Sequence, residues 1–522
     1  MLRTGLMQLP KGIDIVLVVP LIEPTGSPVQ YLDVEILAAC VRSSGFSAAL
    51  LDGQLHGLSV AESLEVAVQA QPALVYWHLP GRRQYQAVAG ALAQPVDAAG
   101  IRMVAGGYFA SRHSATILSA MDGLDAIVHN ELEGPITSLL RGLARGDSWD
   151  ESPGLAVRRG GMVVHNPPGR LLEDLDALPM AAEDLFHAGR FRSGQKVLIN
   201  RGCNSNCSYC GLQVPYRKAF TDSQGFWRSR SPRRIADEIE VYVTRHGIER
   251  FVFEAFVLFG YDKHGEDVIG GIVEEIELRR LEIEISFVTH PGALARNRHL
   301  LPQLRRAGLR DLYLGIDSGL ERALRLYRVE FGISDIYAAL DALHYYGIPF
   351  NVGFFFFDPY MTFHEVREQL AFLRSLRPYF GHMPQPYSFF LDQQLLGSAL
   401  HLNSEMPLVA MLAADGLLVP TDPLAADPAA RFADARTGRY YAAHRRLRRG
   451  EAFHAFRQIS APCVREAAFE ELPLDVAEDL WEILAAHPEM SVDEAAAAAE
   501  ERLRQRLEDS GKSAIEISEF AL

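Results

Sequence analysis

The sequence predicts an α/β protein in three parts: a Rossmann-like, doubly wound parallel sheet, then a partial barrel of six strand–helix units, then a helical C-terminal region. Two observations lead to this prediction. Short apolar runs alternate with helical patterns along most of the chain, and continuous apolar strands between helices are typical of parallel sheets covered on both faces. After about residue 400 the alternation ends, and the composition turns to Ala, Glu, Arg and Leu.

The first part, residues 1–145, contains five strand–helix units. Strands are expected at 14–20, 47–52, 73–79, 101–107 and 125–130. Helical spacing follows each strand, at 31–46, 59–71, 85–100, 114–123 and 134–146. Ligands of such sheets bind beyond the carboxyl ends of the strands, which here are the loops at 20–29, 76–83, 106–111 and 129–135. Residues 146–195, rich in Gly, Pro and charge, are expected to be a linker.

The second part, residues 196–400, repeats the pattern six times. Strands are expected at 196–202, 250–256, 282–290, 311–319, 349–357 and 385–391, with helical segments between them. Six such units predict a partial barrel whose site lies at the carboxyl ends of its strands. Residues 401–522 are expected to form a mostly helical domain, in which "AAAAAEERLRQRL" is typical of a solvated amphipathic helix.

Composition limits the class of protein. The net charge of −15 argues against a nucleic-acid partner. No apolar stretch approaches the length of a transmembrane helix, and the N-terminus lacks a signal-peptide cleavage site. Five cysteines, three of them clustered, do not make a disulfide framework. We therefore expect a cytoplasmic protein without a membrane partner.

The cluster "RGCNSNCSYCG" holds Cys203, Cys207 and Cys210, directly after the first barrel strand. A structural zinc site wants four closed ligands, and both Cys40 and Cys463 lie far away in helical contexts. An iron–sulfur cubane held by three thiolates instead leaves one iron open for another ligand. Zinc with a distant fourth ligand and free thiols are the alternative interpretations.

This cysteine spacing resembles the signature of the radical S-adenosylmethionine (SAM) enzymes, C-x-x-x-C-x-Φ-C, with Tyr209 as the aromatic Φ. The resemblance implies a 4Fe–4S cluster whose open iron binds SAM. Reductive cleavage of SAM then gives a 5′-deoxyadenosyl radical that removes hydrogen from the substrate. It also implies an electron donor such as a flavodoxin or ferredoxin.

Further barrel segments are similar to one branch of that family. "LRRAGLRDLYLGIDSGLERALRLY" resembles a family pattern that implies SAM contacts for Asp317 and Ser318, and Glu254 stands where a polar residue commonly contacts SAM. His290 stands where the family often has an arginine, a charge it replaces only when protonated. The alternatives are a helix N-cap for Asp317 and an ion pair at the barrel rim for Glu254.

The first part resembles the cobalamin-binding domain of the cobalamin-dependent branch. The residues that we expect near cobalamin all follow predicted strands: Tyr76, Trp77, His78, Gly106, Gly107, Tyr108 and Glu131. The domain lacks the D-x-H-x-x-G motif, and the resemblance implies a cobalt without a histidine ligand. His56 in "LDGQLHG" has the wrong spacing and is interpreted as a surface residue. A tight turn at the two glycines and a domain that has lost cobalamin are the alternatives.

The resemblance implies a cobalamin-dependent radical SAM methyltransferase that methylates a carbon of a small-molecule or natural-product intermediate. No catalytic side chain is assigned. A cyclase or rearrangement enzyme without net methylation, and a non-catalytic corrinoid-binding module, are the alternatives. A tRNA methylthiotransferase would need three more cysteines in the first half, which has only Cys40. A peptide substrate is weighed, but no peptide-recognition domain precedes the barrel. The aromatic strands at 349–357 and 385–391 would line the site or fill the barrel core.

Overall fold

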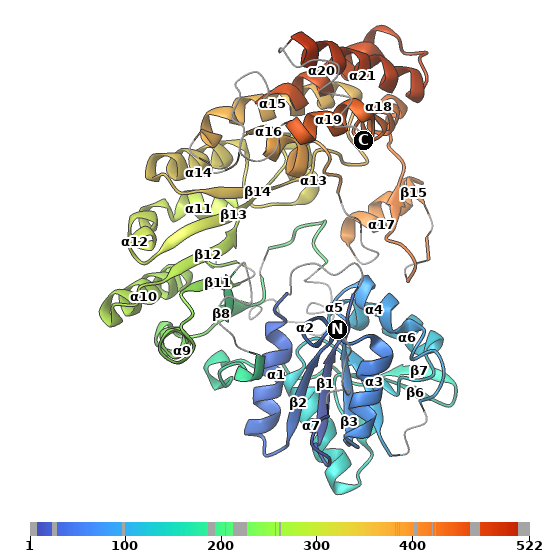
Figure 1. Cartoon of the computed structure of the whole chain (residues 1–522), viewed down its shortest axis with the longest axis vertical. Helices are drawn as coiled ribbons and strands as arrows, with labels where there is room; N and C mark the ends of the chain where they lie inside the picture. Colours follow the sequence, from blue (N-terminus) through green and yellow to red (C-terminus); the bar gives the residue numbers. More distant parts are fainter. Residues whose placement is uncertain are drawn as a thin grey trace.

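The computed structural model confirms the predicted α/β class and places the three parts along one axis (Figure 1). It describes residues 8–22, 29–96, 100–185, 194–203, 205–211, 227–255, 257–259, 263–381, 383, 385, 387–400, 402, 406–419, 421–422, 424–459 and 470–509. The first sheet lies at one end and the C-terminal helices at the other, with the second sheet between them. Cys463 falls outside the described residues. No helix within the described ranges is long and apolar enough to cross a membrane.

Seven strands of the described chain form the first sheet, in the order β2-β1-β3-β4-β5-β6-β7. Five are parallel: β1 (Ile15–Val19), β2 (Ala48–Asp52), β3 (Leu74–His78), β4 (Arg102–Gly106) and β5 (Ala126–Val128). The direction of winding reverses between β1 and β3, and ligands of such sheets bind at that switch point. These strands are buried almost throughout, as their continuous apolar runs predict.

Helices cover both faces of this sheet. They are α1 (Leu32–Ser43), α2 (Gly53–His56), α3 (Val60–Gln69), α4 (Arg82–Ala89), α5 (Tyr108–Arg112), α6 (Ser114–Ala120) and α7 (Glu133–Arg145). Alternate strand residues enter two separate apolar clusters. Tyr76 packs with residues of α1 and α7, whereas Trp77 packs with residues of α3, α4 and α6. The strand pleat therefore decides which side of the sheet each of these aromatic rings occupies.

The predicted linker contains a hairpin that we did not predict. β6 (Leu155–Arg159) pairs antiparallel with β5, and β7 (Met162–His165) pairs antiparallel with β6. Gly160 and Gly161 join the two strands, both with positive φ. A Gly-Gly pair between two short apolar runs is a hairpin signal, so the sequence did carry the information.

The second sheet has the order β14-β13-β12-β11-β8 in the part of the chain that the structure describes, and all of its pairs are parallel. Its strands are β8 (Gln195–Leu198), β11 (Arg250–Glu254), β12 (Glu284–Thr289), β13 (Leu309–Asp317) and β14 (Phe350–Phe354). The helices between them are α9 (Pro232–His246), α10 (Lys263–Arg279), α11 (Pro291–Arg296), α12 (Leu301–Arg306), α13 (Glu321–Tyr327), α14 (Ile333–Tyr346) and α15 (Phe363–Leu376). A short pair, β9 (Asn200–Arg201) and β10 (Arg228–Ser229), follows β8.

The predicted sixth barrel strand at 385–391 is wrong. Residues Tyr387–Phe390 form the helix α16, which continues as a π-helix over Leu391–Leu395. Phe380 packs against both Tyr387 and Phe390, so the aromatic run fills a core as helix. A short apolar run does not distinguish a buried strand from a buried helix.

The C-terminal region is mostly helical, as predicted. It comprises α17 (Pro407–Ala414), α18 (Ala435–Leu447), α19 (Glu451–Ile459), α20 (Leu472–Ala486) and α21 (Val492–Asp509), with the short strands β15 (Leu418–Val419) and β16 (Ala429–Ala430). Its apolar residues belong to the same hydrophobic core as the barrel. Trp481 of α20 stacks on Phe363 of α15 with ring centroids 5.2 Å apart. The buried side of α21, with Leu503 and Leu507, joins this core.

Candidate active site

The three clustered cysteines line one cavity of about 690 Å³ at the carboxyl ends of the barrel strands. Backbone contacts fix their loop in place. The Ser208 amide donates to the Tyr327 carbonyl at 2.8 Å, and the Ser208 hydroxyl donates to the Leu326 carbonyl at 2.6 Å. From the C-terminal region, the Leu408 amide donates to the Ser208 carbonyl at 3.1 Å. The loop is therefore held by the barrel and by α17 together.

The thiols lie in a setting that suits metal binding. Burial, followed by the neighbouring Cys210 and Asp317, raises the pKa of the Cys207 thiol. A metal that coordinates a thiol removes its proton and so overcomes such a shift. Among the described residues, no three His, Cys, Asp or Glu side chains surround one point closely enough for a single ion. A cluster, whose irons each take their own thiolate, needs no such convergence.

Tyr209 and Asp317, both expected near SAM, contact each other in this cavity. The Tyr209 hydroxyl donates to Asp317 Oδ2 at 2.7 Å, and its ring packs edge-on against Tyr327 and Phe355. Burial raises the pKa of the Asp317 carboxyl to about 7, although the Tyr209 hydrogen bond opposes the shift. Asp317 adopts a left-handed conformation with φ of 63°, a strained backbone geometry that is enriched at functional sites. It is not the N-cap of α13, a position that Leu320 occupies.

Ser318 does not line the cavity, although we expected it near SAM. Its side chain is fully buried, and its hydroxyl accepts a hydrogen bond from Gln369 Nε2 at 3.0 Å. The same Gln369 accepts from the Gly319 amide at 2.9 Å and reaches the Phe355 carbonyl at 3.2 Å. In this structure Ser318 shapes the turn that follows β13.

His290 lines the cavity as a neutral side chain. It is the N-cap of α11, where its Nδ1 accepts from the Ala293 amide at 3.3 Å, and its ring stacks on Phe331. Burial, and then Arg296, lowers the pKa of His290 to about 4. The condition under which His290 could replace an arginine charge, protonation, is therefore not met at neutral pH. Because Nδ1 accepts a hydrogen bond, Nε2 carries the proton.

Two buried polar atoms on this side of the cavity have no partner. They are His290 Nε2 and Thr289 Oγ1, both at the carboxyl end of β12. Buried polar groups are nearly always hydrogen-bonded. A polar ligand in the cavity would provide the hydrogen-bond partners that these two atoms lack.

The remaining wall of the cavity is mainly apolar. Val288, Tyr313, Val352, Phe354 and Phe355 line it, together with glycines of β13 and β14. The strand at 349–357 is therefore divided: Phe355 faces the cavity, whereas Phe356 and Phe357 are buried in the core.

Sequence reasoning missed Gln394, which reaches this cavity from the π-helix. Its Oε1 is buried and unpartnered. π-helical turns are frequent at functional sites, but a sequence gives no signal for one.

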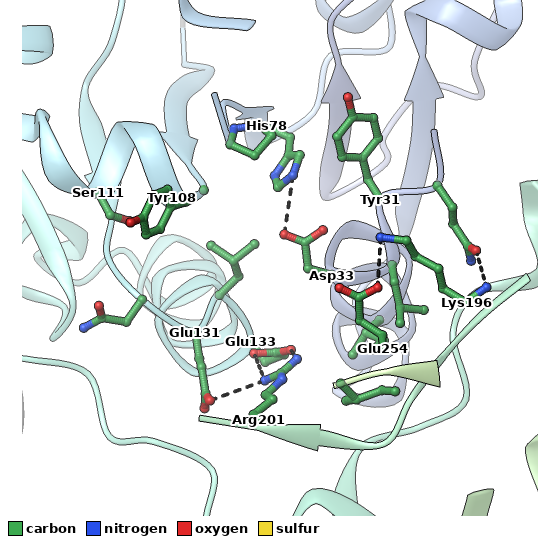
Figure 2. A pocket seen from close by; sticks show the side chains of 18 of the residues that line it. Tyr31, Asp33, His78, Tyr108, Ser111, Glu131, Glu133, Lys196, Arg201 and Glu254 are labelled. Carbon is green, nitrogen blue, oxygen red and sulfur yellow. Dashed lines mark hydrogen bonds and ion pairs between the residues drawn. The ribbon is translucent and has the colours of Figure 1, made fainter. Parts of the chain in front are cut away.

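A second cavity, of about 370 Å³, lies between the carboxyl edge of the first sheet and the start of the barrel (Figure 2). His78, Gly107, Tyr108 and Glu131 line it, as the cobalamin prediction expected. His78 ends β3, and its Nε2 lies 3.4 Å from Asp33 Oδ2 on the first turn of α1. The cavity thus lies at the switch point between β1 and β3.

Several predicted site residues lie outside the cavity in which we expected them, or pack against the protein's own chain. Glu254, expected near SAM, lines this second cavity and pairs with Lys196 at 3.0 Å. Trp77 packs into the core on the opposite face of the sheet. The space beside Gly106 is filled by Tyr76 and Leu132, and the space beside Gly107 by the backbone at 79–80. These two glycines are required by the close approach of their own chain.

Two acidic residues join the first sheet to the barrel. Glu133 accepts two hydrogen bonds from Arg201, the shorter at 2.6 Å, and Glu131 pairs with Arg228 at 2.7 Å. Glu131 also accepts from the Leu172 amide at 3.1 Å. Burial alone would raise the pKa of Glu133, but Arg201 outweighs it and the pKa is lowered. We call these four charged residues the interdomain clamp.

One contact connects the linings of the two cavities. Tyr108 lines the second cavity, and its hydroxyl, with the Arg112 guanidinium, fills the place that a side chain at position 211 would take. Gly211 directly follows Cys210. Arg201, which also lines the second cavity, stands two residues before Cys203. Arg201 therefore lines one cavity, and Cys203, two residues later, lines the other.

The radical SAM superfamily model matches residues 197–373, which include all three cysteines of the cluster. Among curated proteins, the chain is similar to an anaerobic magnesium-protoporphyrin IX monomethyl ester cyclase of Synechocystis sp., at 27% identity over 43% of this chain and 44% of the cyclase. An uncharacterized methyltransferase of Pyrococcus horikoshii is 22% identical over 67% of this chain and 74% of its own length. The hopanoid C-3 methylase of Methylococcus capsulatus is 24% identical over 61% and 59%. The chain thus spans 44% of the cyclase and 59% of the methylase.

Two solved structures show the same fold. The cobalamin-dependent S-adenosylmethionine radical enzyme OxsB, with aqua-cobalamin bound, superposes with a TM-score of 0.76 at 15% identity, over 98% of this chain and 83% of that one. The radical S-adenosylmethionine methyltransferase TsrM from Kitasatospora setae, with cobalamin and a 4Fe–4S cluster bound, has a TM-score of 0.61 at 17% identity, over 79% and 76%.

Proposed function

We propose that this chain, whose residues 197–373 match the radical SAM superfamily model, is a cobalamin-dependent radical SAM methyltransferase acting on a carbon of a small-molecule intermediate. One observation carries the proposal. Tyr108, which lines the cavity at the edge of the first sheet, lies against Gly211, the residue that follows Cys210 of the cysteine cavity. Two cofactors in these cavities would stand next to each other, as transfer of a methyl group between them requires.

The residues of the barrel cavity fit a cluster and SAM. Cys203, Cys207 and Cys210 would hold the 4Fe–4S cluster, which leaves one iron for SAM. The two unpartnered donors, His290 Nε2 and the Thr289 hydroxyl, suit the carboxylate or ribose oxygens of SAM. Asp317, whose carboxyl pKa is raised by burial, can also form a hydrogen bond there.

We place the corrinoid at the second cavity, because ligands of doubly wound sheets bind at this edge. The cavity opens at the switch point of the first sheet and presents a buried imidazole, His78, toward its interior (Figure 2). When bound, the cluster with SAM supplies a radical, and the corrinoid supplies a methyl carrier. The chain's own part is to hold the two groups in cavities whose linings are in contact at Tyr108 and Gly211, and to exclude water with buried aromatic side chains.

The comparisons favour a methyltransferase over a cyclase. The two methyltransferase relatives match 67% and 61% of this chain, whereas the Synechocystis cyclase matches 43%. OxsB and TsrM are similar over both sheets of this chain. The apolar wall of the barrel cavity suits a largely apolar small molecule. An external electron donor such as a flavodoxin or ferredoxin, and a cytoplasmic location, complete the proposal.

Anaerobic reconstitution of the full chain tests the proposal. The protein is incubated with iron, sulfide and hydroxocobalamin, desalted, and analysed for metals and for its visible spectrum. We expect about four irons and one cobalt per chain. Iron without cobalt would overturn the methyltransferase proposal and leave a radical SAM enzyme of another kind. Persistent zinc in place of iron would overturn the cluster itself.

A matched pair of variants separates the two sites. Cys207→Ala removes a cluster ligand and should abolish iron retention while cobalt is still retained. Cys40→Ala, on α1 and outside the barrel cavity, should change neither metal. Product mass then distinguishes net methylation from cyclisation or rearrangement, because methylation adds one methylene unit.

A further inference from the structure

Gln394 brings a polar atom to a part of the cysteine cavity that lies away from the cysteine loop. Its Nε2 donates to Asn351 Oδ1 at 3.5 Å, near the start of β14. Its Oε1 is buried at the cavity and has no hydrogen-bond partner among the described residues. Phe355, which packs on Tyr209 of the cysteine loop, stands at the other end of the strand. At about 3.3 Å per residue, Asn351 lies roughly 13 Å before Phe355 along the chain.

The barrel surface beside this atom is apolar and open. Val288, Tyr313 and Asn351 stand opposite one another on β12, β13 and β14, so the strand pleat places them on one face of the sheet. Val288 is 49% exposed and Tyr313 is 44% exposed, and both line the cavity. Large apolar side chains left uncovered within a cavity indicate a site for an apolar ligand.

The described lining of this cavity has acidic side chains but no basic ones. Asp317 and Glu330 line it, whereas no lysine or arginine does. Burial, followed by Arg296, lowers the pKa of His290 to about 4, so this ring adds no positive charge at neutral pH. An anionic ligand would therefore lose its water without gaining a cation. The lining favours an uncharged molecule that donates a hydrogen bond to the Gln394 oxygen.

The C-terminal region holds the turn that carries Gln394. Asp392 of the same π-helix has a side chain that is 4% exposed, and it pairs with Arg448 at 2.7 Å and with Arg457 at 2.8 Å. The Arg448 guanidinium also fills the space beside Gly397. Hydrogen bonds between these cations and one buried carboxylate are charge-assisted and directional. They fix the π-helix against α18 and α19.

Resting on the proposed function, we propose that Gln394 Oε1 accepts a hydrogen bond from the methyl-accepting substrate, and that this substrate is an uncharged, largely apolar molecule with a hydroxyl or N–H group. Gln394 is thus a specificity-determining residue. Arg448 and Arg457 are positioning residues, because they act on the substrate only through the π-helix. The C-terminal helices thereby take part in substrate recognition.

Equilibrium dialysis of three probes against the full, reconstituted chain tests this inference. The probes are 2-naphthol, which donates a hydrogen bond, 2-methoxynaphthalene, which cannot, and 2-naphthoate, which is an anion. SAM is present and reductant is absent, so no turnover occurs. We expect the wild-type protein to prefer 2-naphthol to 2-methoxynaphthalene. Gln394→Met should reduce this preference by roughly fivefold, because one hydrogen bond is lost. Both proteins are measured with the same probes, so the difference in probe hydrophobicity cancels.

The other outcomes overturn the inference. An unchanged preference in Gln394→Met would exclude the hydrogen bond to Gln394. We expect 2-naphthoate to bind more weakly than either neutral probe, and equal or tighter binding would exclude an uncharged substrate class. Failure of all three probes to bind would also exclude that class. Iron and cobalt are counted in the same samples. If both are retained, these failures leave the proposed function standing, whereas a chain that retains no cobalt overturns the proposed function and this inference with it.

Two further variants separate positioning from stability. Arg457→Gln should reduce the preference for 2-naphthol and leave the affinity for 2-methoxynaphthalene unchanged, because it disturbs the orientation of Gln394. An equal loss of affinity for both probes would overturn the positioning role and leave Arg457 with a structural one. Gln303→Met makes the matched exchange at an exposed position of α12, outside the cavity lining, and should behave as the wild type.

Discussion

His290 shows how burial changes the role of a side chain. It stands where the family often has an arginine, but the ring is buried against Phe331 and its pKa is lowered to about 4. What it offers the cavity is a neutral N–H donor at Nε2. A neutral donor discriminates by hydrogen-bond geometry rather than by charge, and it works over a wide pH range.

We therefore expect SAM affinity to be independent of His290 protonation above about pH 5. His290→Asn, which keeps an N-cap acceptor for α11 but is shorter, should weaken SAM binding by about 1 to 2 kcal/mol, or roughly 5- to 30-fold. Equilibrium binding of SAM to the reconstituted protein measures both effects. His299→Asn, an exposed position, serves as the control. An affinity that rises as pH falls through 6.5 would instead show a cationic histidine.

Among single residues, the sequence predicted the site residues that belong to a recognisable motif. The cysteine spacing identified Cys203, Cys207, Cys210 and Tyr209, and all four line one cavity. It did not predict Gln394, because a π-helix has no sequence signature. The contact of Ser318 with SAM stays a prediction, and nothing in the sequence indicated that its hydroxyl bonds Gln369 in the turn after β13.

The interdomain clamp belongs to the scale of elements. The loop between β5 and α7 supplies Glu131 and Glu133, and the pair β9 and β10 supplies Arg201 and Arg228. From the sequence we expected Glu131 near cobalamin. The structure adds a mechanical contact, because the guanidinium partners come from the barrel and lie far along the chain.

Glu133→Gln leaves Arg201 with a buried charge that is only partly compensated by Glu131 at 3.7 Å. The substitution should destabilise the protein by about 3 kcal/mol, the lower end of the cost of breaking a buried ion pair. Glu173→Gln breaks a surface pair with Arg170 and should cost less than about 1 kcal/mol. Chemical denaturation followed by intrinsic fluorescence compares the two. If the two substitutions lowered the free energy of unfolding equally, the interdomain clamp would stabilise the protein no more than a surface ion pair does.

Helices and strands were predicted correctly where the pattern of apolar residues extended over many positions. The five parallel strands of the first sheet and the five of the second follow from apolar runs between helices, whereas the sixth barrel strand does not exist among the described residues. Residues 387–390 are too few to show a helical period. The β6–β7 hairpin was readable from Gly160-Gly161 but lay in a segment interpreted as a linker by composition.

Over the whole molecule, the C-terminal region is continuous with the barrel. Its helices share the barrel's hydrophobic core, and Leu408 contacts the cysteine loop through Ser208. His444 of α18 lies in this shared core, stacked on Tyr440 with rings 5.9 Å apart. Its Nδ1 has no partner.

Burial, and then Arg448, lowers the pKa of His444 to about 3 from an ordinary 6.5. Between these values the unfolded chain binds the proton and the folded chain does not. Stability should therefore fall as pH drops below 6.5, by up to about 1.4 kcal/mol per pH unit from this group. Above 6.5 the contribution is constant.

His444→Phe should remove this dependence. The thermal unfolding midpoints of the wild-type protein and the variant are compared at pH 7.5 and at pH 5. We expect the difference between the two midpoints to become smaller, or to change sign, at pH 5. His299→Phe, at an exposed site, should run parallel to the wild type. A constant gap for His444→Phe would mean that the histidine is protonated in the folded protein.

Arg201 stands two residues before Cys203 and forms an ion pair with Glu133, at the start of α7 in the first domain. The backbone that would carry iron is thus tied to the domain that would carry cobalt. If both groups bind, their binding equilibria are linked. Such linkage is reciprocal, so the factor by which cobalamin raises the affinity for iron equals the factor by which iron raises the affinity for cobalamin. Loosening the clamp would then lower that shared factor for both metals, even though neither metal touches it.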